Sequence, residues 1–359
     1  MTTIAFIGLG IMGEPMAAHL VDAGHDVVGF NRSRPPVDRL VEHGGRGADS
    51  VAEAVTEAEV VITMVPDSPD VEEVSFGDDG IYRNAKPGTL HIDCSTIRPD
   101  VTRGLAKTAA DRDLRVIDAP VSGGQAGAVE AKLSIMVGGA DDDVAQARPL
   151  LELMGSTVVH VGPIGSGQTV KAANQLMVAG HLELLAEAIV FLEAQGVDTD
   201  AAVEVLGGGL AGSTVLDRKA AGMLGRTFDP GFRVDLHHKD LGIVTAAARE
   251  AGVSIPLGAH VADLVSALRA GPRRPRPQCA AASRRAAVRP LVRHPHRGGL
   301  SHGPDARRRC RRPDPGAGGH PLCLRRPRSS NQPDVQRDAA PRDDHPLPRA
   351  PRRGRGAHG

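Results

Sequence analysis

The sequence predicts an α/β protein, with an N-terminal doubly wound parallel sheet followed by an all-helical domain and a disordered basic tail. Short apolar strand candidates alternate with helical patterns over residues 1–162. Helical patterns alone occupy residues 163–270. From Gly271 onward the composition becomes rich in arginine and proline. We therefore divide the chain into residues 1–162, 163–270 and 271–359.

The first segment begins with an apolar run over Thr3–Gly8, and Gly13–Gly24 follows with helical spacing and Pro15 in its first turn. Alternation of such strands with helices predicts parallel β-α-β units with right-handed crossovers. The nearly continuous apolar run Val60–Val65 is typical of a strand covered on both faces. The further strand candidates are Asp26–Phe30, Glu59–Val65, Thr89–Asp93, Arg115–Val121, Leu133–Gly138 and Thr157–Val161.

A long helix is predicted to open the second domain, because Val170–Gly196 lacks proline and carries helix formers at helical spacing. Its Val178–Phe191 portion is apolar over more than one stripe, which indicates burial against other helices or a second subunit. Further helices are expected at Asp200–Leu206, Asp217–Met223, His237–Ala251 and Pro256–Ala270.

The compartment is expected to be the cytoplasm. No run of 18 uncharged apolar residues occurs, and Met1-Thr2-Thr3-Ile4 leads directly into a strand without a basic region or a cleavage site. Of the four cysteines only Cys94 precedes the tail, and the others lack metal-ligand spacing. We expect no membrane segment, no disulfide framework and no zinc site.

The loop after the first strand has the spacing Gly8-Leu-Gly10-Ile-Met-Gly13 and opens a helix. The first glycine permits a tight turn, the second lets the backbone approach a pyrophosphate, and the third allows close helix packing. The helix N-terminus then faces the phosphate charge. The motif predicts a dinucleotide site with contacts at Gly8, Leu9, Gly10, Ile11, Met12 and Gly13.

The second strand ends at Asn31-Arg32, where NAD-preferring sites place an acidic residue on the ribose hydroxyl. Arg32 could instead meet a 2′-phosphate, so NADPH is favoured over NADH. A solvated surface arginine is the alternative interpretation.

The segment Asp118–Gln125 follows a strand at its carboxyl end, where open α/β sheets bind their ligands. The Ser122 hydroxyl and the amides of Gly123 and Gly124 can donate hydrogen bonds to a carboxylate there. An ordinary glycine-rich connection is the alternative.

Lys171 and Asn174 lie three residues apart near the start of the long helix, so one face presents an ammonium and an amide. Burial or a neighbouring cation would lower the pKa of such a lysine and make it a usable proton donor. A snorkelling surface lysine is the alternative.

The pair Lys239-Asp240 places a second candidate lysine beside a carboxylate at the start of a predicted helix. The alternative to a functional lysine is an exposed salt bridge at this position. The adjacent His237 and His238 diverge by about 100° on a helix. No third ligand stands nearby, so we expect no metal site.

In this order and at these separations, Gly8–Gly13, Asp118–Gln125, Lys171–Asn174 and Lys239–Asp240 resemble the β-hydroxyacid dehydrogenase family. Within it, the segments at 207–217 and 230–240 are more similar to the tartronate semialdehyde reductases than to the 3-hydroxyisobutyrate dehydrogenases. The resemblance implies a Rossmann domain, a helical domain built on a long inter-domain helix, and a homo-oligomer formed through the helical domain.

The resemblance also implies reduction of 2-hydroxy-3-oxopropanoate to glycerate with NADPH or NADH. Alternatives are a 3-hydroxyisobutyrate dehydrogenase or related 3-hydroxy acid dehydrogenase, a non-catalytic dinucleotide-binding protein, and an enzyme damaged at its end. Lys171 would be the acid/base, and Ser122, Gly123 and Asn174 would bind substrate. Further cofactor contacts are implied at Val65, Pro66, Asp70, Thr96 and Lys239.

The tail, Gly271–Gly359, holds 22 Arg and 15 Pro but only six Asp and no Lys or Glu, a net charge of about +16. Family members continue here with a segment like Gly-x-Gly-x-x-Asp-His-Ser-Ala-Leu. One permissible codon choice for the start of the tail, read one base later, gives Gly-His-Gly-Asp-Leu-Asp-His-Ser-Ala-Leu-Leu. We therefore hypothesise a frameshift near Ala270, which resequencing tests. A non-specific nucleic-acid arm is the alternative, but it lacks aromatic residues and any recognisable module.

Overall fold

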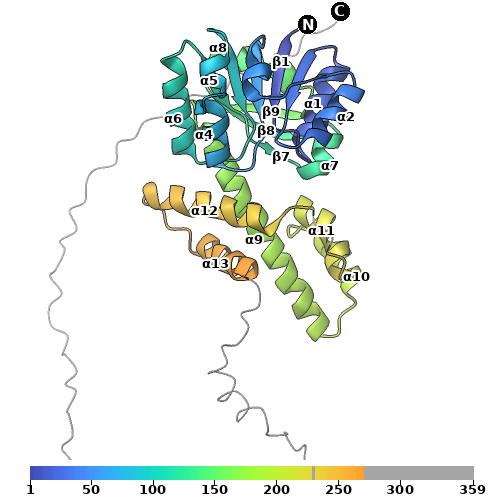
Figure 1. The fold of residues 1–359 in the computed structure, drawn as a ribbon. Coiled ribbons are helices and arrows are strands. Elements are labelled where there is room, and N and C mark those ends of the chain that lie inside the picture. Colours follow the sequence, from blue (N-terminus) through green and yellow to red (C-terminus); the bar gives the residue numbers. More distant parts are fainter. Residues whose placement is uncertain (229–230, 271–359) are drawn as a thin grey trace, which may run out of the picture. The chain divides into compact units, whose positions relative to one another are not determined.

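The computed structural model describes residues 1–228 and 231–270, whose strands form one nine-stranded sheet. Its order is β3-β2-β1-β4-β5-β6-β8-β7, with β9 paired to β8 (Figure 1). The sheet is parallel from β3 to β6, as predicted. The strands are β1 Thr3–Ile7, β2 Asp26–Phe30, β3 Arg46–Gly47, β4 Val60–Thr63, β5 Leu90–Asp93, β6 Arg115–Asp118, β7 Val121–Ser122, β8 Ser134–Gly138 and β9 Thr157–Gly162.

The helices follow the predicted alternation and then the predicted helical run. All five helices expected after residue 162 are present, with ends that differ from the prediction by a few residues. With the sheet lie α1 Gly13–Asp22, α2 Arg34–Glu42, α3 Val51–Val55, α4 Ser68–Phe76, α5 Ile81–Asn84, α6 Pro99–Ala110, α7 Gly124–Val129 and α8 Asp141–Leu151. The second group is α9 Ser166–Ala194, α10 Thr199–Gly207, α11 Thr214–Leu224, α12 Val234–Glu250 and α13 Pro256–Ala270.

One expected strand differs in detail from the prediction. The run Arg115–Val121 forms two strands, β6 and β7, separated by Ala119-Pro120, and both pair with β8 in antiparallel fashion. The chain returns to β8 through the six-residue helix α7, whereas a parallel crossover needs about a dozen residues or more. This short return places Ser122 and the glycines after it at the carboxyl end of the parallel strands.

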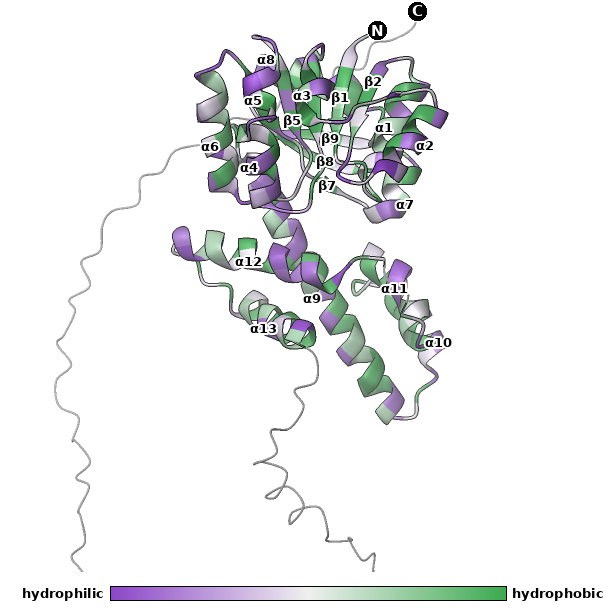
Figure 2. Cartoon of the chain, viewed as in Figure 1, coloured by the Kyte–Doolittle hydropathy of each residue, from purple (hydrophilic) through white to green (hydrophobic). Residues whose placement is uncertain are grey.

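The core lies on both faces of the sheet. One buried cluster includes Phe6, Leu9 and Met16, and the other includes Ile7 and Val61. All four residues of β4 are buried, which confirms that this strand is covered on both faces. Figure 2 shows the corresponding hydrophobic colour along the strands.

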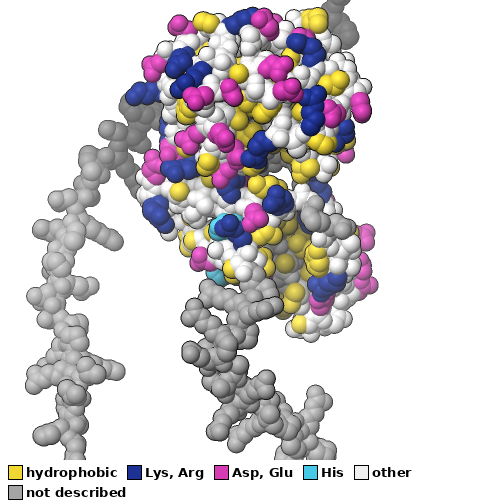
Figure 3. Space-filling model, in the orientation of Figure 1, with side chains coloured by type: hydrophobic (Ala, Val, Ile, Leu, Met, Phe, Trp, Pro, Cys, Tyr) yellow, Lys and Arg dark blue, Asp and Glu magenta, His cyan; other side chains and the backbone are white. Residues whose placement is uncertain are grey.

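Helix α9 is the common element of the second group, with α12 and α13 on one side of it and α10 and α11 on the other (Figure 1). Figure 3 shows hydrophobic side chains gathered between the α12–α13 part and the α10–α11 part, where α9 runs. By length and composition α9 could also span a membrane, a property that core helices share. The exposed large apolar residues of α9 are Val170, Met177, Leu184, Val190 and Phe191.

The proposed boundary after residue 162 falls in the turn between β9 and α9. The expected tail, Gly271–Gly359, and its proposed change of reading frame lie outside the described residues.

Candidate active site

The glycine loop between β1 and α1 has the geometry expected of a phosphate-binding turn. Gly8 adopts φ +101°, and a Cβ there would lie 2.4 Å from the Met64 carbonyl oxygen. A Cβ on Gly13 would lie 1.9 Å from the Gly8 oxygen, so α1 packs against the turn as the motif requires. Met12 occupies the N-cap position and its side chain makes no cap, which leaves backbone N–H groups at this end for an anion.

The end of β2 lies beside this loop. The amide of Leu9 donates to Asn31 Oδ1 at 3.2 Å. The side chain of Arg32 is 77% exposed, and its Nη1 lies 3.4 Å from Asp70 Oδ1 at the start of α4. The structure thus brings together the glycine loop, Asn31-Arg32 and Asp70, with a largely solvated arginine at the edge.

Lys239, from α12, contacts the loops that follow β4 and β5. Its Nζ donates to the Pro66 oxygen at 2.8 Å and to the Thr96 oxygen at 2.5 Å, and lies 3.1 Å from Asp240 Oδ1. The side chains of Lys239 and Asp240 are only 15% and 3% exposed. The alternative of an exposed salt bridge is therefore wrong, because this pair is enclosed between α12 and the loops after β4 and β5.

A buried polar network supports these two loops. Asp93 Oδ1 accepts from the Thr63 hydroxyl at 2.7 Å and from the Ser95 amide at 3.1 Å, while the Val65 amide donates to Ser95 Oγ. Burial raises the pKa of Asp93 to about 6. Cys94, between Asp93 and Ser95 in the chain, is fully buried, and burial raises the pKa of its thiol. The network fixes the backbone that carries Val65 and Thr96.

Asp118 joins the sheet to the start of α9. Its carboxylate accepts from the amide of Gly165 and from the amide of Gln168, each at 2.7 Å. It is fully buried, and burial raises its pKa to about 6 despite these bonds. Cβ atoms on Gly138 or Gly167 would lie within 3 Å of its oxygens, so the junction is closely packed.

Lys171 lies one turn further along α9 and is only 6% exposed. Its Nζ donates to the Val121 carbonyl at 2.8 Å and to Gln175 Oε1 at 3.0 Å. Burial lowers its pKa to about 8, with Asp240 opposing and Lys239 reinforcing this effect. The surface-lysine interpretation is wrong, because the side chain points into the junction between the sheet and α12.

The predicted substrate residues lie next to Lys171. The Ser122 hydroxyl donates to Asn174 Oδ1 at 3.2 Å, which joins β7 to α9. Gly123 and Gly124 adopt φ values of +142° and +64°, a conformation that side chains rarely adopt. A hydroxyl, a glycine turn, an amide and a buried amine therefore converge at the carboxyl end of the sheet.

Two family models match the chain. Residues 3–162 match the NAD binding domain of 6-phosphogluconate dehydrogenase, and residues 165–283 match the NAD-binding domain of NADP-dependent 3-hydroxyisobutyrate dehydrogenase. The 2-hydroxy-3-oxopropionate reductase of Escherichia coli is 38% identical over 261 residues, covering 73% of this chain and 89% of that protein. The chain belongs to the β-hydroxyacid dehydrogenase family.

Other relatives agree with this assignment. The 3-hydroxyisobutyrate dehydrogenase of Pseudomonas aeruginosa is 41% identical over 273 residues, covering 74% of this chain and 92% of that protein. The solved 3-hydroxyisobutyrate dehydrogenase of Mycobacterium tuberculosis with L-serine is 37% identical, with a TM-score of 0.70 and coverage of 76% of this chain and 94% of that chain. The protein is thus an oxidoreductase that uses a nicotinamide dinucleotide.

Three polar residues that lie beside the candidate site residues were not predicted from the sequence. Gln168 bridges to the 95–97 loop, since its Nε2 donates to the Ser95 oxygen and its Oε1 accepts from the Ile97 amide. Gln175 contacts Lys171, and His237 is buried on α12 with its pKa lowered by burial. For the two glutamines the sequence does offer a signal, their spacing, because Gln168, Lys171 and Gln175 share one face of α9.

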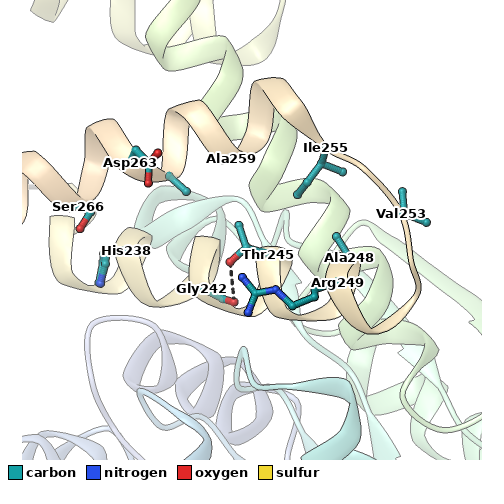
Figure 4. A pocket seen from close by; sticks show the side chains of 11 residues that line it. His238, Gly242, Thr245, Ala248, Arg249, Val253, Ile255, Ala259, Asp263 and Ser266 are labelled. Atoms are coloured by element: carbon teal, nitrogen blue, oxygen red, sulfur yellow. Dashed lines mark hydrogen bonds between the residues drawn. The ribbon is translucent and has the colours of Figure 1, made fainter. Parts of the chain in front are cut away.

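A groove of about 510 Å³ lies between α12 and α13 (Figure 4). Its lining combines apolar side chains such as Ile255 with polar and charged ones that include His238, Arg249 and Asp263. None of the predicted site residues lines it, so the groove is separate from the cofactor loop and from Lys171.

Proposed function

We propose that this dehydrogenase reduces 2-hydroxy-3-oxopropanoate to glycerate, with Lys171 as the general acid. The observation that carries this proposal is the buried amine of Lys171 beside the hydrogen-bonded pair Ser122 and Asn174. Its pKa of about 8 suits proton donation near neutral pH. The 38% identity to the Escherichia coli 2-hydroxy-3-oxopropionate reductase supports this substrate.

Each residue group has a role in the proposed reaction. The Ser122 hydroxyl and the amides of Gly123 and Gly124 bind the substrate carboxylate, and Asn174 orients the substrate beside Lys171. Lys171 gives a proton to the aldehyde oxygen as the aldehyde carbon gains a hydride. The reduced nicotinamide supplies that hydride when bound.

NADPH is proposed as the preferred cofactor. The fit rests on the positive φ of Gly8, the uncapped start of α1, and Arg32 at the end of β2 in place of an acidic residue. Leu9, Gly10 and Ile11 would contact the pyrophosphate, and the loops after β4 and β5 would contact the nicotinamide half through Val65, Pro66 and Thr96. Asp70 and Lys239 would complete the cofactor site.

A second candidate is oxidation of a 3-hydroxy acid such as 3-hydroxyisobutyrate or L-serine. It is favoured by the Pseudomonas aeruginosa 3-hydroxyisobutyrate dehydrogenase and NAD-dependent L-serine dehydrogenase, which are 41% and 39% identical to this chain. The same site would run in the opposite direction, with Lys171 as the base.

We further propose a cytoplasmic homo-oligomer assembled through the helical domain. The exposed Met177, Leu184 and Phe191 along α9 would be covered in such an assembly. Mass measurement by light scattering, on the wild type and on Phe191→Glu, tests this assembly. An unchanged monomer mass for both proteins would contradict it.

The function is tested by following NADPH and NADH oxidation with 2-hydroxy-3-oxopropanoate and identifying glycerate as the product. NADP⁺ and NAD⁺ reduction with glycerate, 3-hydroxyisobutyrate and L-serine forms the comparison panel. The expected result is the highest kcat/KM with 2-hydroxy-3-oxopropanoate and NADPH. A folded protein that turns over none of these acids with either cofactor would contradict the enzyme proposal.

Replacing Arg32 by alanine is expected to raise the KM for NADPH by about ten- to a hundredfold and to leave the KM for NADH unchanged, because a charge-assisted contact contributes about 1.5–3 kcal/mol. Arg34→Ala is the matched control, since Arg34 already pairs with Asp38 and Asp49. Equal effects of Arg32→Ala on the two cofactors would indicate a surface arginine instead.

The pH dependence of the reaction follows from Lys171. Reduction needs the protonated amine, so kcat for reduction is expected to fall as pH rises through about 8. Oxidation needs the neutral amine, so its kcat is expected to rise through the same range. Rates measured at saturating substrate between pH 6 and pH 10 check this, and parallel profiles in both directions would exclude Lys171 as the titrating group.

A further inference from the structure

Gln175 occupies the centre of the polar cluster around Lys171. It is buried, at the position four residues after Lys171 on α9. Its Oε1 accepts from Lys171 Nζ at 3.0 Å and from Asn174 Nδ2 at 2.8 Å, while its Nε2 donates to Asp240 Oδ2 at 2.5 Å. One amide therefore joins two of the proposed site residues to a carboxylate on α12.

The chemistry of the neighbours fixes which way this amide points. An ammonium has no lone pair and cannot accept a hydrogen bond, so the group facing Lys171 must be the oxygen. A carboxylate accepts only, so the group facing Asp240 must be the nitrogen. The amide of Asn174 is oriented in turn, because its Nδ2 faces Gln175 and its Oδ1 accepts from Ser122.

In the described part of the chain, the hydrogen-bond partners of Lys171 leave one direction open for proton transfer. An ammonium carries three donors, and two of them are taken by the Val121 oxygen on β7 and by Gln175 on α9. The third is left for a substrate oxygen. After that proton leaves, the same two acceptors hold the remaining N–H groups, and the lone pair lies where the proton was.

Gln175 also lies between two opposite charges. Among the residues that the structure describes, the charged and titratable groups facing Lys171 are Asp240, Lys239 and His237, all on α12. Within the described residues, β7 contributes only the carbonyl of Val121 and α9 only the neutral Gln175 as polar partners. A carboxylate in direct contact with Lys171 would hold its proton more tightly.

We propose that Gln175 is a positioning residue that orients Lys171 and Asn174 through one shared acceptor and keeps the Asp240 carboxylate one side chain away from the Lys171 ammonium. This inference rests on the proposed role of Lys171 as the acid. Gln175 itself does not exchange a proton with substrate.

The decisive variant exchanges the amide at position 175 and the carboxylate at position 240, by combining Q175E with D240N. The double variant keeps the net charge and the same two functional groups but brings the carboxylate into contact with Lys171. The pH at which reduction is lost is expected to rise by about one to three units, the shift typical of an opposite charge in contact. An unchanged profile in a folded double variant that still binds NADPH would overturn the proposal.

The orienting role is tested separately with Gln175→Met, which keeps the volume but removes the shared acceptor. We expect kcat to fall at least about tenfold while the Kd for NADPH stays constant, because misplaced reacting groups lose rate rather than cofactor affinity. Gln146→Met is the matched control, since it makes the same replacement on α8, where Gln146 is exposed and contacts Arg115 instead of the residues around Lys171. It is expected to leave the pH profile of kcat in place. A Gln175→Met enzyme with wild-type kcat would overturn the orienting role.

A measurement without turnover separates this inference from the proposed function. In protein labelled with ¹³C at lysine Cε, the Lys171 signal is assigned by its loss in Lys171→Met, and its pKa is read from an NMR titration. The exchanged variant is expected to show a higher Lys171 pKa even if no tested acid is a substrate. Turnover without this pKa difference contradicts the inference, whereas the pKa difference without turnover contradicts only the proposed function.

Discussion

Lys171→Met is expected to lower kcat for aldehyde reduction by about 10²–10⁴-fold, the usual contribution of a positioned general acid. Methionine fills nearly the same volume on α9 but has no proton to give and no charge to stabilise the developing alkoxide. The loss should appear in kcat, because the proposed cofactor contacts are made by the glycine loop and by Lys239 instead. Stopped-flow or steady-state measurement of NADPH oxidation at saturating aldehyde checks it.

The control for this substitution is Lys107→Met, which removes an exposed lysine from α6. It should keep wild-type kcat. NADPH fluorescence on binding should be the same for both variants and the wild type. A Lys171→Met enzyme that retains more than half of the wild-type kcat would exclude the acid role and favour proton donation by water.

Asp118→Ala is expected to produce the largest loss of stability of any single substitution discussed. It leaves the amides of Gly165 and Gln168 buried without an acceptor at the start of α9. Each unsatisfied buried donor costs about 1–3 kcal/mol, so the free energy of unfolding should fall by about 2–6 kcal/mol. The midpoint of urea unfolding, followed by circular dichroism, measures the change.

Asp141→Ala provides the comparison, because Asp141 is 95% exposed in the first turn of α8. A surface substitution of this kind should change stability by no more than about 0.5 kcal/mol. Equal unfolding midpoints for Asp118→Ala and Asp141→Ala would show that the Asp118 carboxylate does not hold the junction between the sheet and α9.

The sequence was most informative where periodicity and glycine spacing act locally. Apolar spacing, together with the positions of glycine and proline, predicts three elements that the structure contains, at Thr3–Ile7, Asp26–Phe30 and Pro256–Ala270. Gly8 and Gly13 have the backbone geometry that their motif requires, because that geometry depends on a few adjacent residues. The family resemblance is confirmed by matches along both domains.

Features that depend on tertiary packing could not be predicted in the same way. Spacing alone put Lys171 on a helix face but could not tell whether that face was covered, since burial depends on Val121 and Asp240, which are distant in sequence. The proposed role of Gln175 depends on three partners on two helices, Lys171 and Asn174 on α9 and Asp240 on α12. The antiparallel return at β8 depends on the length of α7, which the apolar pattern of Arg115–Val121 did not reveal.

The burial of Cys94 has a practical consequence for studying this protein. Its thiol sits at the end of β5 with no exposed surface and a raised pKa, so a maleimide or iodoacetamide cannot reach a reactive thiolate there in the folded state. Alkylation of Cys94, followed by mass spectrometry of its own peptide, therefore reports how often the centre of the sheet opens. Slower labelling in the presence of NADPH would measure how strongly the dinucleotide holds that centre closed.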